Sequence, residues 1–302
     1  MNEEIINSLR KIGYRFLGSN HSAIKICTWT RNAIRGKGVC YKQKFYGIES
    51  NRCIQMSPAI FNCTHRCLFC WRNTNITYPK WIGPVDEPDV IMDEAIAAQK
   101  EILMGFGGNE TANKRKFYDA LHPKHVAISL AGEPLLYPKI SELIEEVLSR
   151  KMTAFVVTNG TLPEVLEKMA EPTQLYITLP APDKEIYEKT CQPLIVKGWE
   201  KLNESLSLLN NFSCNTVIRL TLVKDLNFVH PEKYAKIIDK TNSKFVEVKS
   251  FMSVGFSRER IAYEKMPLHN EIQEFAKKIA EESGYKIVDE QKESRVVLLR
   301  RY

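Results

Sequence analysis

The chain has 302 residues, of which 44% are hydrophobic and 26% are charged, and its formal net charge is +7 at pH 7. This composition supplies enough apolar side chains for a packed core, and no apolar run reaches the ~18 residues expected of a membrane-spanning helix. The moderate positive charge permits a nucleic-acid partner without requiring one.

The N-terminal stretch MNEEIINSLRKIGYRF, residues 1–16, is acidic and then amphipathic. It lacks the basic-then-apolar order of a signal peptide, so we expect a cytoplasmic protein whose thiols stay reduced. The chain has 8 cysteines, which in that compartment indicate metal binding or catalysis before disulfides.

The segment from Thr28 to Ile48 has no acidic residue and is loop-like in composition. Its basic residues are Arg31, Arg35, Lys37, Lys42 and Lys44, and its aromatic residues are Trp29, Tyr41, Phe45 and Tyr46. Near the C-terminus, Arg295, Arg300 and Arg301 add further positive charge. Basic side chains neutralise phosphates and aromatic side chains stack on bases, so this mixture suits RNA. The alternative is a solvated loop with aromatic side chains in the core.

Strands followed by helices recur along most of the chain. The expected strands cover residues 124–134, 152–160, 174–182, 216–223 and 245–255, and the expected helices cover 89–106, 139–150, 162–170, 199–209, 231–240 and 269–283. This alternation predicts right-handed βαβ units and a parallel sheet, with functional residues on the loops that follow the strands. An eight-unit barrel needs ~250 residues, whereas about 200 residues carry these units, which favours an open partial barrel.

Three cysteines, Cys63, Cys67 and Cys70, follow one another in the order C-x3-C-x2-C. Structural zinc prefers four ligands, and His65 or His21 could supply the fourth. Three thiolates on one short loop can also hold three corners of a [4Fe-4S] cluster, which leaves the fourth iron open to a small molecule.

The motif, with the aromatic Phe69 just before its last cysteine, resembles the signature of radical S-adenosylmethionine enzymes. The resemblance implies a partial (β/α)6 TIM-like barrel. It also implies that S-adenosylmethionine chelates the open iron and is split to a 5'-deoxyadenosyl radical, with Phe69 among the cofactor-binding residues.

Two later segments match the order of that family. LAGEPLL, residues 130–136, resembles the G-G-E loop that binds the methionine amino group, with an alanine in place of the first glycine and with Gly132 and Glu133 retained. In VTNG, residues 157–160, the resemblance makes Thr158 and Asn159 candidate contacts to the ribose or carboxylate. A solvated acid and an ordinary Asn-Gly turn are the alternatives.

A second set of cysteines lies upstream, with Cys27, Cys40 and Cys53 spaced C-x12-C-x12-C. Equal spacing across a basic, loop-like region indicates a second metal site, and three unrelated core cysteines are the alternative. Cys191 and Cys214 follow no pattern, and we interpret them as core or loop cysteines.

The stretches GVCYKQKFYGIESNRCIQMSPAIFNCTHRCLFCWR and AGEPLLYP resemble the archaeal tRNA 4-demethylwyosine synthases, and the resemblance runs over nearly the whole chain. That family belongs to wybutosine biosynthesis on tRNA-Phe. It implies a lyase that uses pyruvate and S-adenosylmethionine to close a tricyclic base on 1-methylguanosine beside the anticodon. No flavodoxin domain is visible, so the resemblance implies an external electron donor of flavodoxin or ferredoxin type. We expect a monomer with no membrane partner.

The upstream cysteines would then hold a second [4Fe-4S] cluster, whose open iron could chelate pyruvate. Its carbonyl could also condense with a lysine to a Schiff base. The resemblance favours a lysine in this segment, and we choose Lys42 first and Lys44 second; phosphate contact or solvation is the alternative for both.

We expect three regions: an extension over residues 1–52 that supplies second-cluster ligands, a radical S-adenosylmethionine barrel over 53–260, and a C-terminal helix and strand over 261–302 packed on the barrel. Two other functions stay open. One is another radical enzyme with an auxiliary cluster, and the other is a zinc-bound RNA-binding protein without catalysis.

Overall fold

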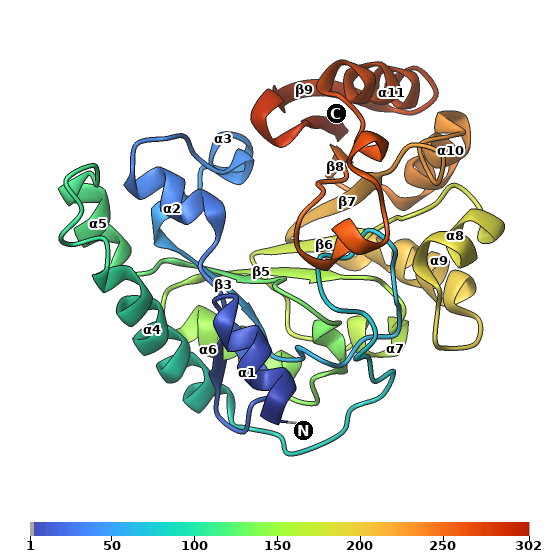
Figure 1. The fold of residues 1–302 in the computed structure, drawn as a ribbon. Helices are drawn as coiled ribbons and strands as arrows, with labels where there is room; N and C mark the ends of the chain where they lie inside the picture. The colour runs from blue at the N-terminus through green and yellow to red at the C-terminus, as the bar shows by residue number, and fades with distance from the viewer. Residues whose placement is uncertain (1–2, 302) are drawn as a thin grey trace. The chain divides into compact units, whose positions relative to one another are not determined.

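The computed structural model describes residues 3–301, and these fall into two compact units that interleave along the chain (Figure 1). Unit 1 contains the residues up to Asn62, Trp81–Val156 and Ala170–Thr173. Unit 2 contains Cys63–Lys80, Val157–Met169 and the residues from Gln174 onward. None of the helices in residues 3–301 combines the length and apolar character needed to cross a membrane.

Unit 1 is built around a sheet with strand order β1-β2-β3-β4-β5. Its strands are β1 Arg15–Leu17, β2 Ser22–Ile24, β3 Cys53–Ser57, β4 His125–Ile128 and β5 Thr153–Thr158. Its helices are α1 Glu3–Lys11, α2 Thr28–Ile34, α3 Tyr41–Tyr46, η1 Ser50–Arg52, α4 Pro88–Met104, α5 Lys114–Ala120, η2 Pro134–Leu136 and α6 Ile140–Ser149. Strands β1, β2 and β3 pair antiparallel, and β3, β4 and β5 pair parallel.

The register of the parallel strands places chemically important side chains on one face of this sheet. Cys53, His125 and Thr153 form one row across β3, β4 and β5. Phe155 lies two residues further along β5, and alternate residues of a strand face the same side. Cys53 and Phe155 therefore lie on the same face.

Residues 28–48, which have a loop-like composition, include the two helices α2 and α3. The two helices are short and begin directly after a cysteine. Cys27 and Cys40 are their N-cap residues, with φ/ψ of −66°/142° and −63°/143°. Hence Cys27 and Cys40 share a local structure, in which each cysteine ends extended backbone and precedes a helix, whereas Cys53 follows η1 and begins β3. The sequence did not reveal the two helices because glycines and charged residues surround both of them.

Unit 2 contains a sheet with strand order β6-β7-β8-β10-β9. Its strands are β6 Gln174–Thr178, β7 Asn215–Leu222, β8 Phe245–Ser250, β9 Tyr285–Gln291 and β10 Val296–Arg301. Its helices are α7 Pro163–Leu166, α8 Lys184–Cys191, α9 Gly198–Leu208, η3 Leu209–Asn211, α10 Pro231–Thr241, η4 Gly255–Glu259, η5 Tyr263–Lys265, α11 His269–Glu281 and η6 Lys292–Ser294. Strands β6, β7 and β8 pair parallel, and β10 pairs antiparallel with both β8 and β9.

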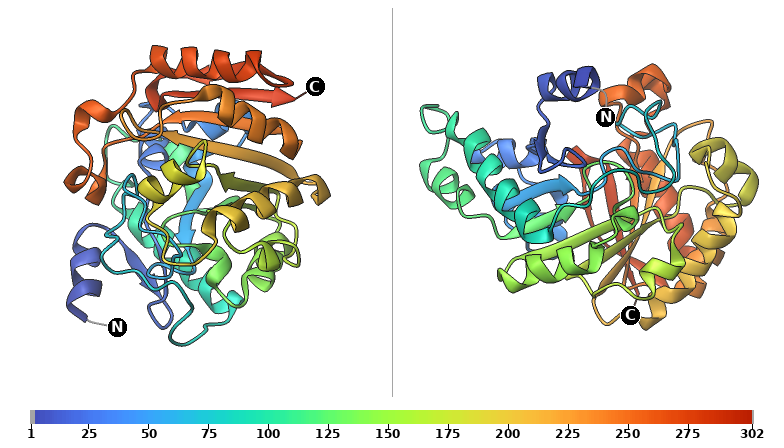
Figure 2. Two further views of the ribbon diagram at one scale, coloured as in Figure 1. Left: turned by 90° about the vertical axis from the view of Figure 1, so that its right-hand side faces the viewer. Right: turned by 90° about the horizontal axis from the view of Figure 1, so that it is seen from below.

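The last helix, α11, lies along the C-terminal strands of unit 2 (Figure 2). Its apolar residues Ile272, Phe275, Ala276 and Ile279 recur at helical spacing and are buried. Strand β10 buries Val296 through Leu299 against this helical layer. The amphipathic pattern of the helix therefore attaches the C-terminal hairpin to the parallel strands.

Each unit thus contributes three parallel strands, and the strand and helix order is the predicted order of a partial (β/α)6 barrel. The strands and helices predicted between residues 89 and 283 are all present, although α7 is only 4 residues long. The division into functional regions 1–52, 53–260 and 261–302 stays a prediction.

Candidate metal centres

The first candidate centre is the loop that carries Cys63, Cys67 and Cys70 in unit 2. Cys63 is buried, and the other two thiols are half-buried. Backbone hydrogen bonds attach the loop to the end of α8: the Arg66 N–H donates to Cys191 O at 3.0 Å, and the Leu68 N–H donates to Thr190 O at 2.9 Å. The loop is therefore held in place by the main chain rather than by its ligands.

A buried cation lies beside the three thiols. The Arg72 side chain is 6% exposed and donates to Ile76 O at 2.8 Å and to His65 O at 3.3 Å. Burial by itself would lower the pKa of its guanidinium, but the three thiols of the loop raise it above its usual value. Its Nε has no hydrogen-bond partner within residues 3–301.

This donor set fits an iron–sulfur cluster. Three thiolates and a cluster carry negative charge, which the Arg72 guanidinium would offset at close range. The Arg72 Nε–H could donate a hydrogen bond to a cluster sulfide. Hydrogen bonds to the sulfurs are a usual feature of iron–sulfur sites.

Two further residues from the C-terminal half of unit 2 support the loop. Arg260 donates from Nε to Leu68 O at 3.1 Å and also bonds to Cys70 O. Gly255 has φ of +58°, and a Cβ there would lie 2.5 Å from Trp71 O, so the close approach of these segments requires glycine.

The turn after β5 contacts the cysteine loop. Asn159 Nδ2 donates to Thr64 Oγ1 at 2.8 Å and lies 3.8 Å from Cys63 Sγ. Thr158 is buried, and its Oγ1 accepts the Gly160 N–H at 3.0 Å. Phe69 is half-buried and packs against an apolar cluster whose members are Val223, Phe251, Ile261 and Met266. That Thr158, Asn159 and Phe69 contact S-adenosylmethionine stays a prediction.

The loop with Gly132 and Glu133 belongs to unit 1. Gly132 has φ of +72°, and a Cβ there would lie 1.8 Å from Ala59 O, so no other residue fits. Glu133 is 1% exposed; its N–H donates to Asn62 O at 2.7 Å and its carboxylate accepts the Leu135 N–H at 3.1 Å. The glycine allows the tight turn that buries this carboxylate.

The second candidate centre is formed in unit 1 by Cys27, Cys40 and Cys53. Burial, together with the other two thiols, raises the pKa of Cys53 to about 12, and the nearby Lys42 ammonium opposes the shift. The four side chains are therefore close enough to interact electrostatically. The donor set fits a second cluster with three cysteine ligands.

The two lysines named by the sequence have different surroundings. Lys42 is half-buried, and its Nζ lies 5.1 Å from the centroid of the Phe155 ring, on the sheet face that carries Cys53. Lys44 lies on the same short helix and is exposed. The structure thus brings Lys42, rather than Lys44, to the upstream cysteines.

Several of the residues proposed to contact RNA make contacts within the protein. Arg35 stacks on Phe106 with its guanidinium carbon 5.1 Å from the ring centroid, whereas Lys37 is exposed. Tyr41 is 7% exposed and packs against Phe45. At the C-terminus, Arg301 donates to Asp239 O at 2.8 Å.

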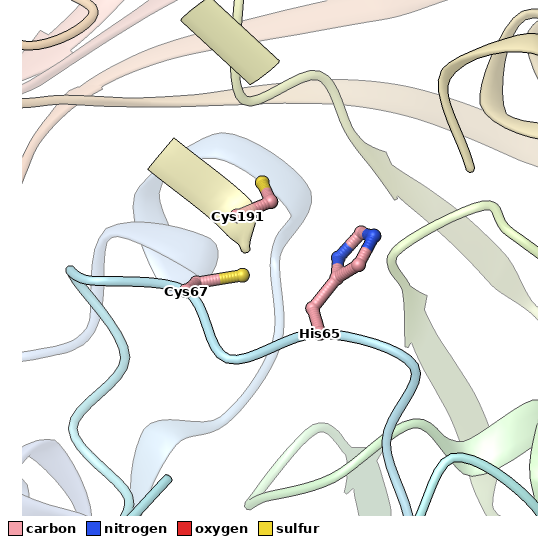
Figure 3. Close-up of side chains that lie close together, drawn as sticks. All are labelled: His65, Cys67 and Cys191. Carbon is pink, nitrogen blue, oxygen red and sulfur yellow. The ribbon is translucent and has the colours of Figure 1, made fainter. Parts of the chain in front are cut away.

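The two histidines considered as a fourth zinc ligand, His21 and His65, have different surroundings. His21 has both ring nitrogens engaged, with Nδ1 2.7 Å from Pro58 O and Nε2 2.9 Å from an Asp86 carboxylate oxygen. His65 instead lies beside Cys67 and Cys191 (Figure 3). Sequence reasoning missed the roles of Arg72 and Arg260. Arg260 bonds to Leu68 over 192 positions, and contacts over such a separation leave no spacing signal. Cys191 is buried, in agreement with its interpretation as a core or loop cysteine.

Comparison with known proteins identifies the family. Residues 58–238 match the radical SAM superfamily, and residues 240–301 match a family described as wyosine base formation. The chain is 47% identical to an S-adenosyl-L-methionine-dependent tRNA 4-demethylwyosine synthase of Pyrococcus abyssi, covering 100% of this chain and 90% of the relative. The chain belongs to the radical SAM tRNA 4-demethylwyosine synthases.

Other members of this synthase family agree. The Methanocaldococcus jannaschii synthase is 41% identical, over 98% of this chain and 96% of the relative. A solved structure of TYW1 with a lysine-pyruvate adduct bound superposes with a TM-score of 0.90 at 41% identity, covering 100% of this chain and 96% of that one. Membership in the synthase family confirms the predicted fold class, and it implies S-adenosylmethionine, a [4Fe-4S] cluster and a tRNA substrate.

Proposed function

We propose that this synthase condenses 1-methylguanosine, beside the anticodon of tRNA-Phe, with pyruvate to form the tricyclic base 4-demethylwyosine. The reaction is of the lyase class, because the pyruvate carboxylate leaves as the new ring closes. The observation that carries this proposal is the cluster of Cys27, Cys40, Cys53 and Lys42 in unit 1. A TYW1 structure with a lysine-pyruvate adduct supports a lysine in this role.

The upstream cysteines would hold the second [4Fe-4S] cluster, and Lys42 would bind pyruvate beside it. An ammonium attracts the pyruvate carboxylate, and its neutral form attacks the carbonyl carbon to give a Schiff base with loss of water. The Phe155 ring, 5.1 Å from Nζ, limits where the lysine can reach. Lys44, exposed on the same helix, is the second candidate.

The cysteine loop of unit 2 would hold the first cluster. With S-adenosylmethionine bound, this cluster supplies the 5'-deoxyadenosyl radical. Arg72 would offset the charge of the three thiolates, and Asn159 would fix the loop through Thr64. Gly132 and Glu133 would receive the methionine ammonium, since a buried carboxylate is a strong acceptor for it.

Two further expectations belong to this proposal. An external donor of flavodoxin or ferredoxin type would supply electrons, and the protein would act as a monomer. The positively charged side chains of Arg31, Arg35 and Lys37 would contact tRNA phosphates.

Isotope labelling tests the proposed reaction. The anaerobic enzyme is supplied with S-adenosylmethionine, a reductant and tRNA that carries 1-methylguanosine. Pyruvate labelled at the carbonyl carbon should leave its label in the modified base, and pyruvate labelled at the carboxylate should not. A modified base without the carbonyl label would overturn the role of pyruvate.

The second cluster needs its own test. A variant with Cys27→Ala, Cys40→Ala and Cys53→Ala should lose about half of its iron, because one of two equivalent clusters is gone. It should still cleave S-adenosylmethionine slowly and make no tricyclic base. Cys214→Ser is the matched control, since Cys214 is half-buried and belongs to unit 2. Full iron in the triple variant would remove the second cluster from the proposal.

A further inference from the structure

A fourth thiol lies next to the three of the cysteine loop and is not accounted for by the proposed function. Cys191, the last residue of α8, is fully buried. One ligand atom from each of His65, Cys67 and Cys191 lies within 4.8 Å of the others. These are an imidazole and two thiols, which are the donor types that zinc prefers.

The three side chains lie close together. Figure 3 shows the Cys67 sulfur directed toward the His65 ring, with the Cys191 side chain beside them at the end of α8. Ligands of a tetrahedral zinc ion lie roughly 3.3–3.8 Å apart, given metal–ligand lengths of ~2.0–2.3 Å. Side-chain shifts of about an ångström would therefore close the site around a metal.

The imidazole is oriented for this role. His65 Nε2 is 2.6 Å from the Tyr187 hydroxyl, and the ring nitrogen on the other side faces the two sulfurs (Figure 3). A partner on the second ring nitrogen fixes the orientation of most metal-binding histidines. Tyr187 lies on α8, the same helix as Cys191, so this helix positions both residues.

We propose that His65, Cys67 and Cys191 form a mononuclear zinc site in the cluster-free protein. A water molecule would complete the tetrahedron. Because Cys67 is also a ligand of the first cluster, zinc and the cluster cannot be bound at the same time. Zinc would attach the cysteine loop to the C-terminal end of α8, and cluster assembly would have to displace it.

Cobalt is a spectroscopic probe for this site. A full-length background variant with serine at Cys27, Cys40, Cys53, Cys63 and Cys70 keeps the three proposed ligands and lacks both sets of cluster cysteines. Under anaerobic conditions with a phosphine reductant, it should bind one Co²⁺ and show the charge-transfer and ligand-field bands of a tetrahedral thiolate site. Absence of these bands in the folded variant, checked by circular dichroism, would overturn the proposal.

Single changes in that background identify the ligands. Tyr187→Phe should weaken Co²⁺ binding by about 10-fold through the lost hydrogen bond, and Cys191→Ser should weaken it by more than that. Cys214→Ser is the matched control and should leave affinity unchanged, because Cys214 is absent from the three-residue group. Equal affinities for Cys191→Ser and Cys214→Ser would rule out the site.

A second measurement uses the chain with all cluster cysteines intact and does not rely on activity. One equivalent of Zn²⁺, added before anaerobic reconstitution, should slow iron incorporation into Cys214→Ser and have a much smaller effect on Cys191→Ser. Without zinc, both should take up iron at the parental rate. Equal retardation of the two variants by zinc would contradict competition at Cys67. This test is independent of the pyruvate reaction, so its failure would leave the proposed function unaffected.

Discussion

The side-chain nitrogen of Lys42 lies 5.1 Å from the centroid of the Phe155 ring. Both residues belong to unit 1. Phe155 lies on β5, two positions after Thr153, and Thr153 pairs with His125 on β4. The aromatic ring faces the ammonium and keeps it near Cys53 instead of in bulk solvent.

Lys42→Arg should abolish covalent capture of pyruvate, because a guanidinium keeps the charge and cannot form a Schiff base. Borohydride reduction with labelled pyruvate, followed by peptide mass spectrometry, measures the adduct. Lys44→Arg on the same helix is the control, and it should form the reduced pyruvate adduct to the same extent as the parent. Equal labelling of the two variants would remove Lys42 from the pyruvate site.

Glu133→Gln should weaken S-adenosylmethionine binding and leave thermal stability close to that of the parent. The amide oxygen can still accept the Leu135 N–H, whereas the charge that would bind an ammonium is gone. Glu133→Ala should also cost about 1 kcal/mol of stability through the lost acceptor. Calorimetric binding and thermal melting separate the effects. An unchanged dissociation constant for Glu133→Gln would exclude this carboxylate from binding.

Arg72→Met should lower the iron retained per chain and accelerate loss of iron to a chelator, because the first cluster would lose its buried cation. Arg66→Met is the control, since Arg66 lies on the same loop and is exposed. Iron counting and the rate of bleaching give the comparison. If the two variants retain iron equally well, Arg72 has no role in holding the cluster.

Replacing Arg31, Arg35 and Lys37 with glutamine should weaken tRNA binding and flatten its salt dependence. Each lost phosphate contact should reduce the slope of log K against log salt by ~0.7–0.9. A variant with Lys236→Gln, Lys240→Gln and Lys278→Gln removes the same charge from exposed positions of α10 and α11. Parallel slopes for the two variants would show that the positive charge of Arg31, Arg35 and Lys37 makes no specific contribution.

His125 should make unfolding depend on pH. Burial lowers the pKa of His125 to about 4, from an ordinary value of 6.5. Between these values the unfolded chain binds more protons, so stability present above pH 6.5 is lost as the pH falls toward 4. The loss should be of order 2 kcal/mol.

Denaturant unfolding at several pH values tests this expectation. His125→Gln should show a smaller loss, because glutamine can accept the Glu49 N–H and donate to Thr153 Oγ1 without titrating. His122→Gln is the control, since His122 is exposed and neighbours the same strand. The same pH dependence in both variants would contradict the assignment to His125.

The sequence predicted the parallel strands because their signals are local. Periodicity places β7 within a residue, and the spacing of Cys63, Cys67 and Cys70 is a motif in itself. Helices α2 and α3 were missed because they have 7 and 6 residues and no acidic cap, so propensity could not identify them. Their positions depend on tertiary contacts, such as the 3.0 Å bond from Thr30 Oγ1 to Ser50 O.

The supporting residues could not be predicted for a different reason. Arg260 bonds to Leu68 across 192 positions, and Cys191 meets Cys67 through the placement of α8. Neither residue belongs to a motif, and only the folded chain brings them to the loop. The pairing of Lys42 with Phe155 has the same origin, because it depends on the register of β5 in the sheet.

The interleaved order of the two units has a consequence for synthesis on the ribosome. The backbone partners of the cysteine loop, Thr190 and Cys191, are translated more than 100 residues after Cys70. At ~5–20 residues per second, the three thiols emerge roughly 6–24 s before the chain that anchors them. We expect the nascent loop to stay unanchored during that interval, so that iron delivery to the first cluster follows synthesis of α8.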